Sequence, residues 1–137
     1  MASLDTSILV DILRRKSRFH HRAVKKLDEL VTRGENLATT CFTVAELYVG
    51  IELSDNPQKD HAGVKSLLDD LEILEFHGYS SILLFAQIRA AQRLQGRTGG
   101  DMDTLIAATT LAAGHNILVT RNLSDFLYVP TLTVEDY

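Results

Sequence analysis

The sequence predicts an α/β fold in which helices cover both faces of a short-stranded parallel sheet. Two observations support this prediction. Short apolar, strand-like runs alternate along the chain with longer stretches of helical periodicity, and this alternation is typical of parallel strands joined by helical crossovers. The length of 137 residues is that of one domain with a proper core. We therefore expect a single domain over residues 1–137.

In the first half of the chain, glycine and proline mark where the expected helices begin and end. Gly34 follows a long basic stretch and is expected to end that helix. Pro57 is expected just inside the start of a later helix, where its missing N–H has no cost. The expected elements are a strand over 2–5, helices over 7–15 and 18–33, a strand over 36–40, and helices over 43–53 and 58–71.

In the second half, a glycine-rich break at residues 96–101 separates two expected helices. The expected elements are a strand over 72–76, helices over 79–95 and 103–113, a strand over 117–119 and a last strand over 131–134. Crossovers between parallel strands are right-handed. In open sheets of this type, binding and catalytic sites form just beyond the C-terminal ends of the strands, so we expect the site there.

Acidic side chains occupy these positions. They lie at the end of the first strand, one helical turn after the second, at the start of the helix over 103–113, and after the strand over 117–119. Carboxylates gathered in one crevice repel one another and raise each other's pKa unless a cation neutralises them. Oxygen ligands without Cys or His suit Mg²⁺ or Mn²⁺ and disfavour zinc. The acids are Asp5, Glu46, Asp101, Asp103 and Asp125, and the amide Asn122 accompanies them.

Each acid also has a plainer role as a helix or turn cap. Thr43 and Glu46 have the spacing of a capping box, in which the glutamate reaches back to the helix start. Asp5, Asp101, Asp103 and Asp125 also stand where they could cap a helix or turn. Independent caps have no reason to converge on one end of one sheet, so we favour a shared site.

Four stretches, in their order and spacing, resemble the PIN-domain ribonucleases, and within them the VapC toxins of toxin–antitoxin pairs. They are LDTSILVDIL, TVAELYVGIE, DTLIAATTLAAG and LVTRNLSDF. The resemblance extends from Leu4 to the closing VPTLTVEDY. It implies an α/β/α sandwich, an endoribonuclease dependent on Mg²⁺ or Mn²⁺, a homodimer, and a VapB-type antitoxin as partner.

The resemblance also implies which residues act. The family's first three acids fall on Asp5, Glu46 and Asp103, which would hold the metal that activates water for hydrolysis of an RNA phosphodiester bond. The fourth position, often an aspartate, is Asn122, and Asp125 could supply its charge from nearby. Asp101 is expected to be an auxiliary ligand.

Hydroxyl and basic side chains are the candidates for contacts with RNA. Thr6, Ser7 and Thr120 match hydroxyls that often line sites of this family. Arg121 is a candidate phosphate contact, with a surface ion pair as its alternative, and we favour the phosphate.

A basic cluster adds Arg14 and Arg15 to these candidates. Half of the 14 Lys and Arg residues fall between Arg14 and Lys26, with no acid among them, in a chain of net charge −4. Such a cluster suits phosphates, but it also fits the solvated face of an amphipathic helix. Both interpretations stay open.

Two phosphoryl-transfer classes and a non-catalytic role are alternatives to the ribonuclease. A haloacid-dehalogenase-type phosphatase needs a second aspartate two residues after the first, where Ser7 stands, and a response-regulator receiver needs an acidic pair near the first strand. Both are disfavoured. A catalytically silent PIN-fold interaction module stays an alternative.

Two further expectations concern the surroundings of the protein. No apolar run reaches the roughly 20 residues of a membrane span, and Cys41 is the only cysteine, so we expect a cytoplasmic protein. Apolar residues beyond the needs of a small core suggest a dimer interface. They are Tyr48, Val49, Ile51 and those of residues 80–88.

Overall fold

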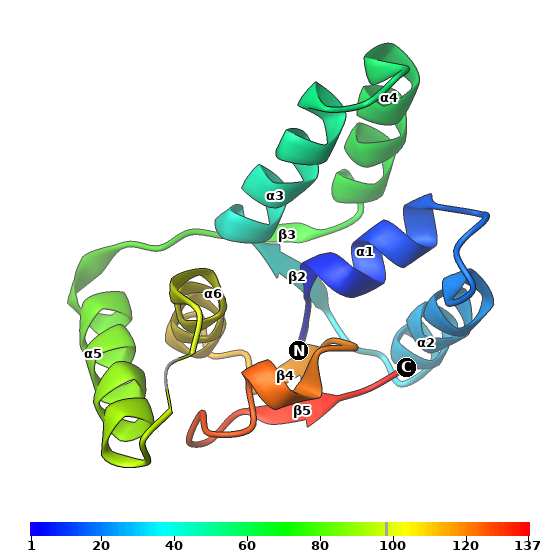
Figure 1. The fold of residues 1–137 in the computed structure, drawn as a ribbon. Helices are drawn as coiled ribbons and strands as arrows, with labels where there is room; N and C mark the ends of the chain where they lie inside the picture. Colours follow the sequence, from blue (N-terminus) through cyan, green and yellow to red (C-terminus); the bar gives the residue numbers. More distant parts are fainter. Residues whose placement is uncertain (98) are drawn as a thin grey trace.

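The five strands form one parallel sheet, as the sequence predicts, and their order in the structure is β3-β2-β1-β4-β5. A computed structural model describes residues 1–97 and 99–137 (Figure 1). The strands are β1 (Ala2–Leu4), β2 (Leu37–Thr40), β3 (Glu72–Leu74), β4 (Ile117–Val119) and β5 (Thr133–Glu135). β1 is central, and it pairs with β2 on one side and with β4 on the other. The carboxyl ends of β1, β2 and β4 therefore share one edge of the sheet.

Helices connect successive strands and cover both faces of the sheet. In Figure 1, α1 and α2 lie on one side of the strands, and α5 and α6 lie on the other. Within the described residues, no helix combines the length and the apolar content needed to cross a membrane. The helices are α1 (Thr6–Leu13), α2 (His20–Thr32), α3 (Cys41–Glu52), α4 (Pro57–Leu68), α5 (Gly78–Leu94) and α6 (Asp101–Ala112), with a short 3₁₀ helix, η1 (Leu123–Asp125).

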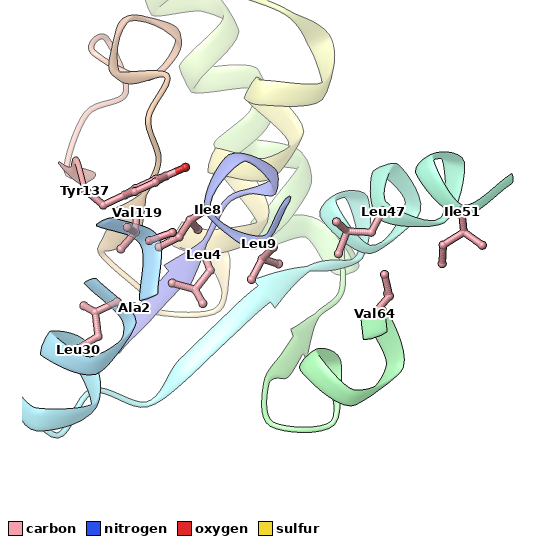
Figure 2. Close-up of a cluster of buried hydrophobic side chains, with 11 residues drawn as sticks. Ala2, Leu4, Ile8, Leu9, Leu30, Leu47, Ile51, Val64, Val119 and Tyr137 are labelled. Carbon is pink, nitrogen blue, oxygen red and sulfur yellow. The ribbon is translucent and has the colours of Figure 1, made fainter. Parts of the chain in front are cut away.

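Two separate hydrophobic clusters hold these layers together. The first, shown in Figure 2, joins β1 to α1–α4 through side chains that include Leu4, Ile8 and Leu47. The second joins β4 to α5 and α6 on the opposite face through Leu118, Ile88 and Ile106. Burial of apolar area on both faces is what makes the short strands stable. The expected α/β/α sandwich is thus confirmed.

The glycine and proline signals in the first half act as expected. Gly34 follows the last turn of α2 with a φ of +75°, a conformation that glycine adopts at little cost. Its N–H donates to the carbonyl of Val31. Pro57 is the first residue of α4, and the Asn56 side chain caps that helix by accepting from the N–H of Lys59.

Some boundaries differ from the expected ones, and one difference removes the capping-box alternative. α3 begins at Cys41 rather than at residue 43, because the Thr40 side chain caps it by accepting from the N–H of Thr43 at 3.2 Å. Glu46 is consequently too far along α3 to reach back to its start, so the capping box was wrong. α2 begins at His20 instead of 18, and β5 occupies 133–135 instead of 131–134.

The other acids are not helix caps either. Asp5 precedes α1, but its side chain makes no capping hydrogen bond. α6 begins at Asp101, two residues earlier than expected, and the residue at its cap position is Gly100. Asp125 lies inside η1, whose cap position is held by Asn122. The carboxylates at the carboxyl edge of the sheet therefore need an explanation other than capping.

Candidate active site

Asp5 lies directly after the central strand and is almost completely buried, with 4% of its surface exposed. Its backbone N–H donates to the carbonyl of Val119, which ties it to β4. Its Oδ2 accepts a hydrogen bond from Thr120 Oγ1 at 2.7 Å and a weaker one from Ser7 Oγ at 3.5 Å. Burial raises the pKa of the Asp5 carboxyl, and the hydrogen bond from Thr120 opposes that rise.

The hydroxyls of Ser7 and Thr120 form a small network around Asp5. The two oxygens lie 3.3 Å apart. Each also accepts a backbone hydrogen bond from the segment after β4: Ser7 Oγ from the N–H of Arg121 at 3.1 Å, and Thr120 Oγ1 from the N–H of Asn122 at 3.0 Å. The start of α1 and the end of β4 are thus joined at the Asp5 carboxylate.

Glu46 reaches the same crevice from α3. Thr6 Oγ1 donates to Glu46 Oε1 at 3.2 Å and lies 3.3 Å from Thr43 Oγ1. The pKa of Glu46 is raised, chiefly by partial burial and further by the negative charge of Asp5, against the hydrogen bond from Thr6. The hydroxyl of Thr6 therefore holds Glu46 beside a second carboxylate.

Asp103, in the first turn of α6, has its pKa raised by burial and by the negative charges of the other clustered acids. Burial and the charges of Asp125, Asp5 and Glu46, in that order, raise the pKa of Asp103 to about 6. Its carboxylate also lies close to the backbone of Gly100, where an added Cβ would stand 3.2 Å from Asp103 Oδ2. Four acids from separate elements are thus close enough to act on one another.

The fourth acidic position is shared between two residues. Asn122 is exposed, and its backbone N–H is bound to Thr120. Asp125 is the residue whose charge acts most strongly on Asp103. The structure therefore favours Asp125 over Asn122 as the source of negative charge, while Asn122 supports the hydroxyl network.

Asp101 has a different partner. Its side chain is 89% exposed and forms an ion pair with Arg89, at 2.6 Å between Oδ1 and Nη2. It is not among the groups that shift the pKa of Asp103, although it lies two residues away. This ion pair gives Asp101 a partner outside the four clustered acids, and its role as an auxiliary ligand stays a prediction.

The donor set fits a hard divalent cation bound largely through water. Carboxylate and hydroxyl oxygens line the crevice, and neither Cys nor His is among the groups that shift the pKa of Asp103. Across residues 1–97 and 99–137, no three acidic, His or Cys side chains stand close enough together to hold an ion between them directly. Mg²⁺ keeps several of its waters and binds through one or two carboxylates. The spacing is therefore compatible with that ion.

Arg121 makes the ion pair that was the alternative to a phosphate contact. Its Nη1 lies 3.4 Å from Asp11 Oδ2, and its guanidinium stands 4.0 Å above the ring of Phe19. The ion pair with Asp11 is thus formed, and the phosphate contact stays a prediction. The Arg121 backbone reaches the Asp5 network, while its side chain points to the α1–α2 connection.

Asp11 is a residue that the sequence pattern did not single out. It is buried, and its carboxylate accepts from Ser17 Oγ and from Tyr137 O–H, each at 2.7 Å, besides pairing with Arg121. The available signal was an acid within the otherwise apolar turn pattern of TSILVDIL. Asp11 holds Arg121, the α1–α2 connection and Tyr137 together.

Arg14 and Arg15 lie apart from the acids. Both are exposed in the connection that follows α1, at the opposite end of that helix from Asp5. The eight residues of α1 span about 12 Å. Contact between these arginines and RNA would therefore occur away from the reacting phosphate.

Comparisons with known proteins show which family the chain resembles. The PIN domain family model matches residues 2–130. Ribonuclease VapC2 of Haemophilus influenzae is 32% identical, over 98% of this chain and 96% of its own. The tRNA(fMet)-specific endonuclease VapC of Salmonella typhimurium is 30% identical, over 83% of this chain and 89% of its own. The crystal structure of DNA-bound VapBC from Salmonella typhimurium superposes with a TM-score of 0.81 at 27% identity, over 98% of this chain and 96% of that one.

Proposed function

The chain belongs to the PIN-domain family, and from that membership we propose that it is a VapC-type endoribonuclease that works with Mg²⁺ or Mn²⁺. The observation that carries the proposal is the electrostatic coupling of Asp103 to Asp125, Asp5 and Glu46 at the carboxyl edge of the sheet. Uncompensated, four neighbouring carboxylates would repel an RNA phosphate. A divalent cation converts the same cluster into a site that attracts one.

Asp5, Glu46 and Asp103 would hold the cation largely through its bound water, with the charge of Asp125 close by. The bound cation would polarise the scissile phosphate and lower the pKa of a water molecule. Ser7 and Thr120 keep the Asp5 carboxylate oriented and favour its ionised form. Thr6 fixes Glu46 in the same way. These hydrogen bonds preorganise the ligands before RNA arrives.

The base in this site would be hydroxide bound to the cation rather than a histidine. None of the five histidines is among the groups that shift the pKa of Asp5, Glu46 or Asp103. Asp103, with a pKa of about 6, exchanges a proton near neutral pH. It is therefore the carboxylate whose protonation most directly links cation binding to pH.

The test is cleavage of a mixed RNA pool by the purified protein with Mg²⁺, with Mn²⁺ and with EDTA. Asp5→Asn is the inactive variant, and Asp101→Asn is the matched control, because Asp101 lies outside the cluster. Metal-dependent cleavage by the wild type and by Asp101→Asn, but not by Asp5→Asn, supports the proposal. Equal cleavage by Asp5→Asn would contradict it and point to a contaminating nuclease. The initiator tRNA is the first defined substrate to add, because one relative is named for it.

The antitoxin is the proposed protein partner. The solved relative from Salmonella typhimurium is VapBC, so we propose a VapB-type partner for this chain. An acidic pocket suits a basic side chain from such a partner. Purification with and without the co-expressed neighbouring gene product tests this: ribonuclease activity should fall when the partner is bound.

A homodimer is proposed on apolar exposure. Ile51 does not contribute, because it is buried in the first hydrophobic cluster. Exposed apolar side chains do remain on α3, in the residue after it, and on α5, where small proteins seldom leave several together. They are Tyr48, Val49, Leu53, Tyr79, Ile82, Leu83 and Leu94. Light scattering of Leu83→Glu against the wild type should show a shift from dimer to monomer.

The alternative function is a catalytically silent interaction module. It would predict no cleavage under any metal condition after an antitoxin has been ruled out in the preparation. The four coupled carboxylates favour the enzyme, because a module that only binds a partner has no need of an arrangement that raises the pKa of Asp103.

A further inference from the structure

A basic groove of about 1100 Å³ opens where α1 ends, between the α1–α2 connection and the start of α4. Basic side chains dominate its charged lining. They are Arg14, Arg15, Lys16, Arg18, Lys59 and Arg121. The only acids that line it are Asp11 and Asp60. In a chain whose net charge is −4, this is a local concentration of positive charge.

The two acids of the basic groove are already engaged. Asp11 is buried and is bound by Ser17, Tyr137 and Arg121. Asp60 accepts a hydrogen bond from the Ser54 hydroxyl. Within the described residues, Arg14, Arg15, Lys16 and Lys59 form no ion pair, and all four are exposed. Their charge is therefore available to a ligand.

Arg121 connects the basic groove to the acidic cluster. Its backbone N–H binds Ser7, which in turn binds Asp5, while its guanidinium lines the groove and stands above Phe19. The distance along α1 is about 12 Å. That is too far for the side chains of Arg14 and Arg15 to touch the reacting phosphate, but it suits contacts with phosphates further along the same RNA strand.

We propose that the basic groove binds the phosphate backbone of the RNA substrate beside the cleavage site. The inference rests on the proposed ribonuclease function and adds how the substrate is held. An acidic catalytic cluster gives little affinity for a polyanion, so the attraction has to come from neighbouring positive charge. Contacts of this type fix the position of RNA without reading its sequence.

The test removes two charges from the basic groove in Arg14→Gln/Arg15→Gln. The matched control, Lys65→Gln/Arg93→Gln, removes the same charge from exposed residues that do not line the groove. Binding of labelled initiator tRNA is measured by fluorescence polarisation in the non-cleaving Asp5→Asn background, across a range of salt concentrations. Cleavage of the same RNA is measured in the active background.

Removal of two phosphate contacts should weaken binding about 25-fold at 0.1 M salt, because each contact to a single strand releases about 0.7 of a counterion. The slope of log affinity against log salt should fall by about 1.4. In cleavage, KM should rise while kcat stays close to that of the wild type, because the reacting phosphate is not touched. The control variant should stay close to the wild type in both assays.

The experiment can contradict the groove proposal and the ribonuclease proposal independently of each other. Cleavage by the wild type, with equal binding by the groove and control variants, would overturn the groove and leave the ribonuclease intact. An equal loss in both variants would also overturn it, because the effect would then be general charge. If the groove variant bound RNA normally but lost a co-expressed antitoxin, the groove would belong to an acidic peptide and the inference would be wrong. Absence of cleavage by the wild type, with RNA binding lost only in the groove variant, would overturn the proposed function while supporting the groove.

Discussion

Thr120 donates a hydrogen bond of 2.7 Å to the carboxylate of Asp5, although 115 positions separate the two residues along the chain. The contact joins the end of β4 to the end of β1, and both partners are buried. A buried carboxylate is costly without a partner. The hydroxyl of Thr120 therefore supports both the fold and the ligand that the site requires.

Thr120→Val should weaken both the stability of the fold and the ability of Asp5 to act as an ionised ligand. Valine has nearly the shape of threonine but donates no hydrogen bond, so the Asp5 carboxylate loses its shortest hydrogen bond. We expect a loss of about 1–3 kcal/mol in the free energy of unfolding at pH 7. The pKa of Asp5 should rise further, so the acid limb of the pH–activity profile should move to higher pH. Thr120→Ser is the control, since it keeps the hydroxyl, and its pH profile should stay in place. Urea unfolding and cleavage rates at several pH values measure the two effects.

Asp103→Asn should stabilise the protein in EDTA at neutral pH. Asp103 has a folded pKa of about 6, above the ordinary value of 3.8, so its charged form is disfavoured by folding. The wild type therefore gains stability as the pH falls from above 6 to about 4, while the variant does not. After solvent screening is allowed for, the difference at pH 7.5 should be about 1–2 kcal/mol. Urea titrations at pH 7.5 and pH 4 measure it, and an equal difference at both would contradict the assignment.

Mg²⁺ should raise the melting temperature of the wild type and leave that of Asp103→Asn almost unchanged. A ligand that binds only the folded state stabilises it by mass action, by about 2.7 kcal/mol at one hundred times the dissociation constant. Asp101→Asn serves as the matched control, because its carboxylate pairs with Arg89 outside the cluster. Thermal scans with Mg²⁺, with Mn²⁺ and with EDTA provide the measurement. A shift lost equally in both variants would place the ion elsewhere on α6.

Gly100→Ala should weaken cation binding with little effect on folding. The new Cβ would stand 3.2 Å from Asp103 Oδ2, which is tight enough to displace that carboxylate by a few tenths of an ångström. We expect cleavage to need several-fold more Mg²⁺ for half-maximal rate. Gly50→Ala, in α3, is the control, because no atom stands within 4 Å of its added Cβ. That control should be slightly stabilising, since alanine favours a helix over glycine by roughly 1 kcal/mol.

Tyr137→Phe should loosen the side chains that hold Arg121. The variant leaves Asp11 without one of its two 2.7 Å hydrogen bonds, which should cost about 1–2 kcal/mol of unfolding free energy. Because Arg121 lines the basic groove, RNA binding should weaken modestly as well. Tyr128→Phe is the control, and chemical unfolding together with fluorescence polarisation measures both variants. Full stability in Tyr137→Phe would show that Ser17 and Arg121 together satisfy Asp11.

The layout of the sheet and the meeting of Asp5, Glu46 and Asp103 were within reach of the sequence. Short apolar runs and helical periodicity define a parallel sheet, and acids that follow its strands must gather at the carboxyl edge. The first residue of α3 could not be predicted from the sequence, because Thr40 and Thr43 are equally good N-cap residues. Which of them caps the helix depends on where the preceding strand ends.

The partners of single charged side chains were harder still. Asp101 and Asp103 are two residues apart in the first turn of one helix, yet one pairs with Arg89 and the other faces the cluster. Arg121 likewise forms an ion pair with Asp11, whose carboxylate comes from the end of α1 that is distant from Asp5. Contacts of this type depend on how helices pack, and neither spacing nor composition records that packing.

The central place of β1 has a consequence for the newly made chain. β1 cannot complete its pairing until β4 has been synthesised, more than a hundred residues later in the chain. Until then Asp5 has neither Thr120 nor the carbonyl of Val119 beside it. Pairings between such distant segments form late in folding. The hydrogen bonds that hold the Asp5 carboxylate can therefore form only after β4 and Thr120 have been made.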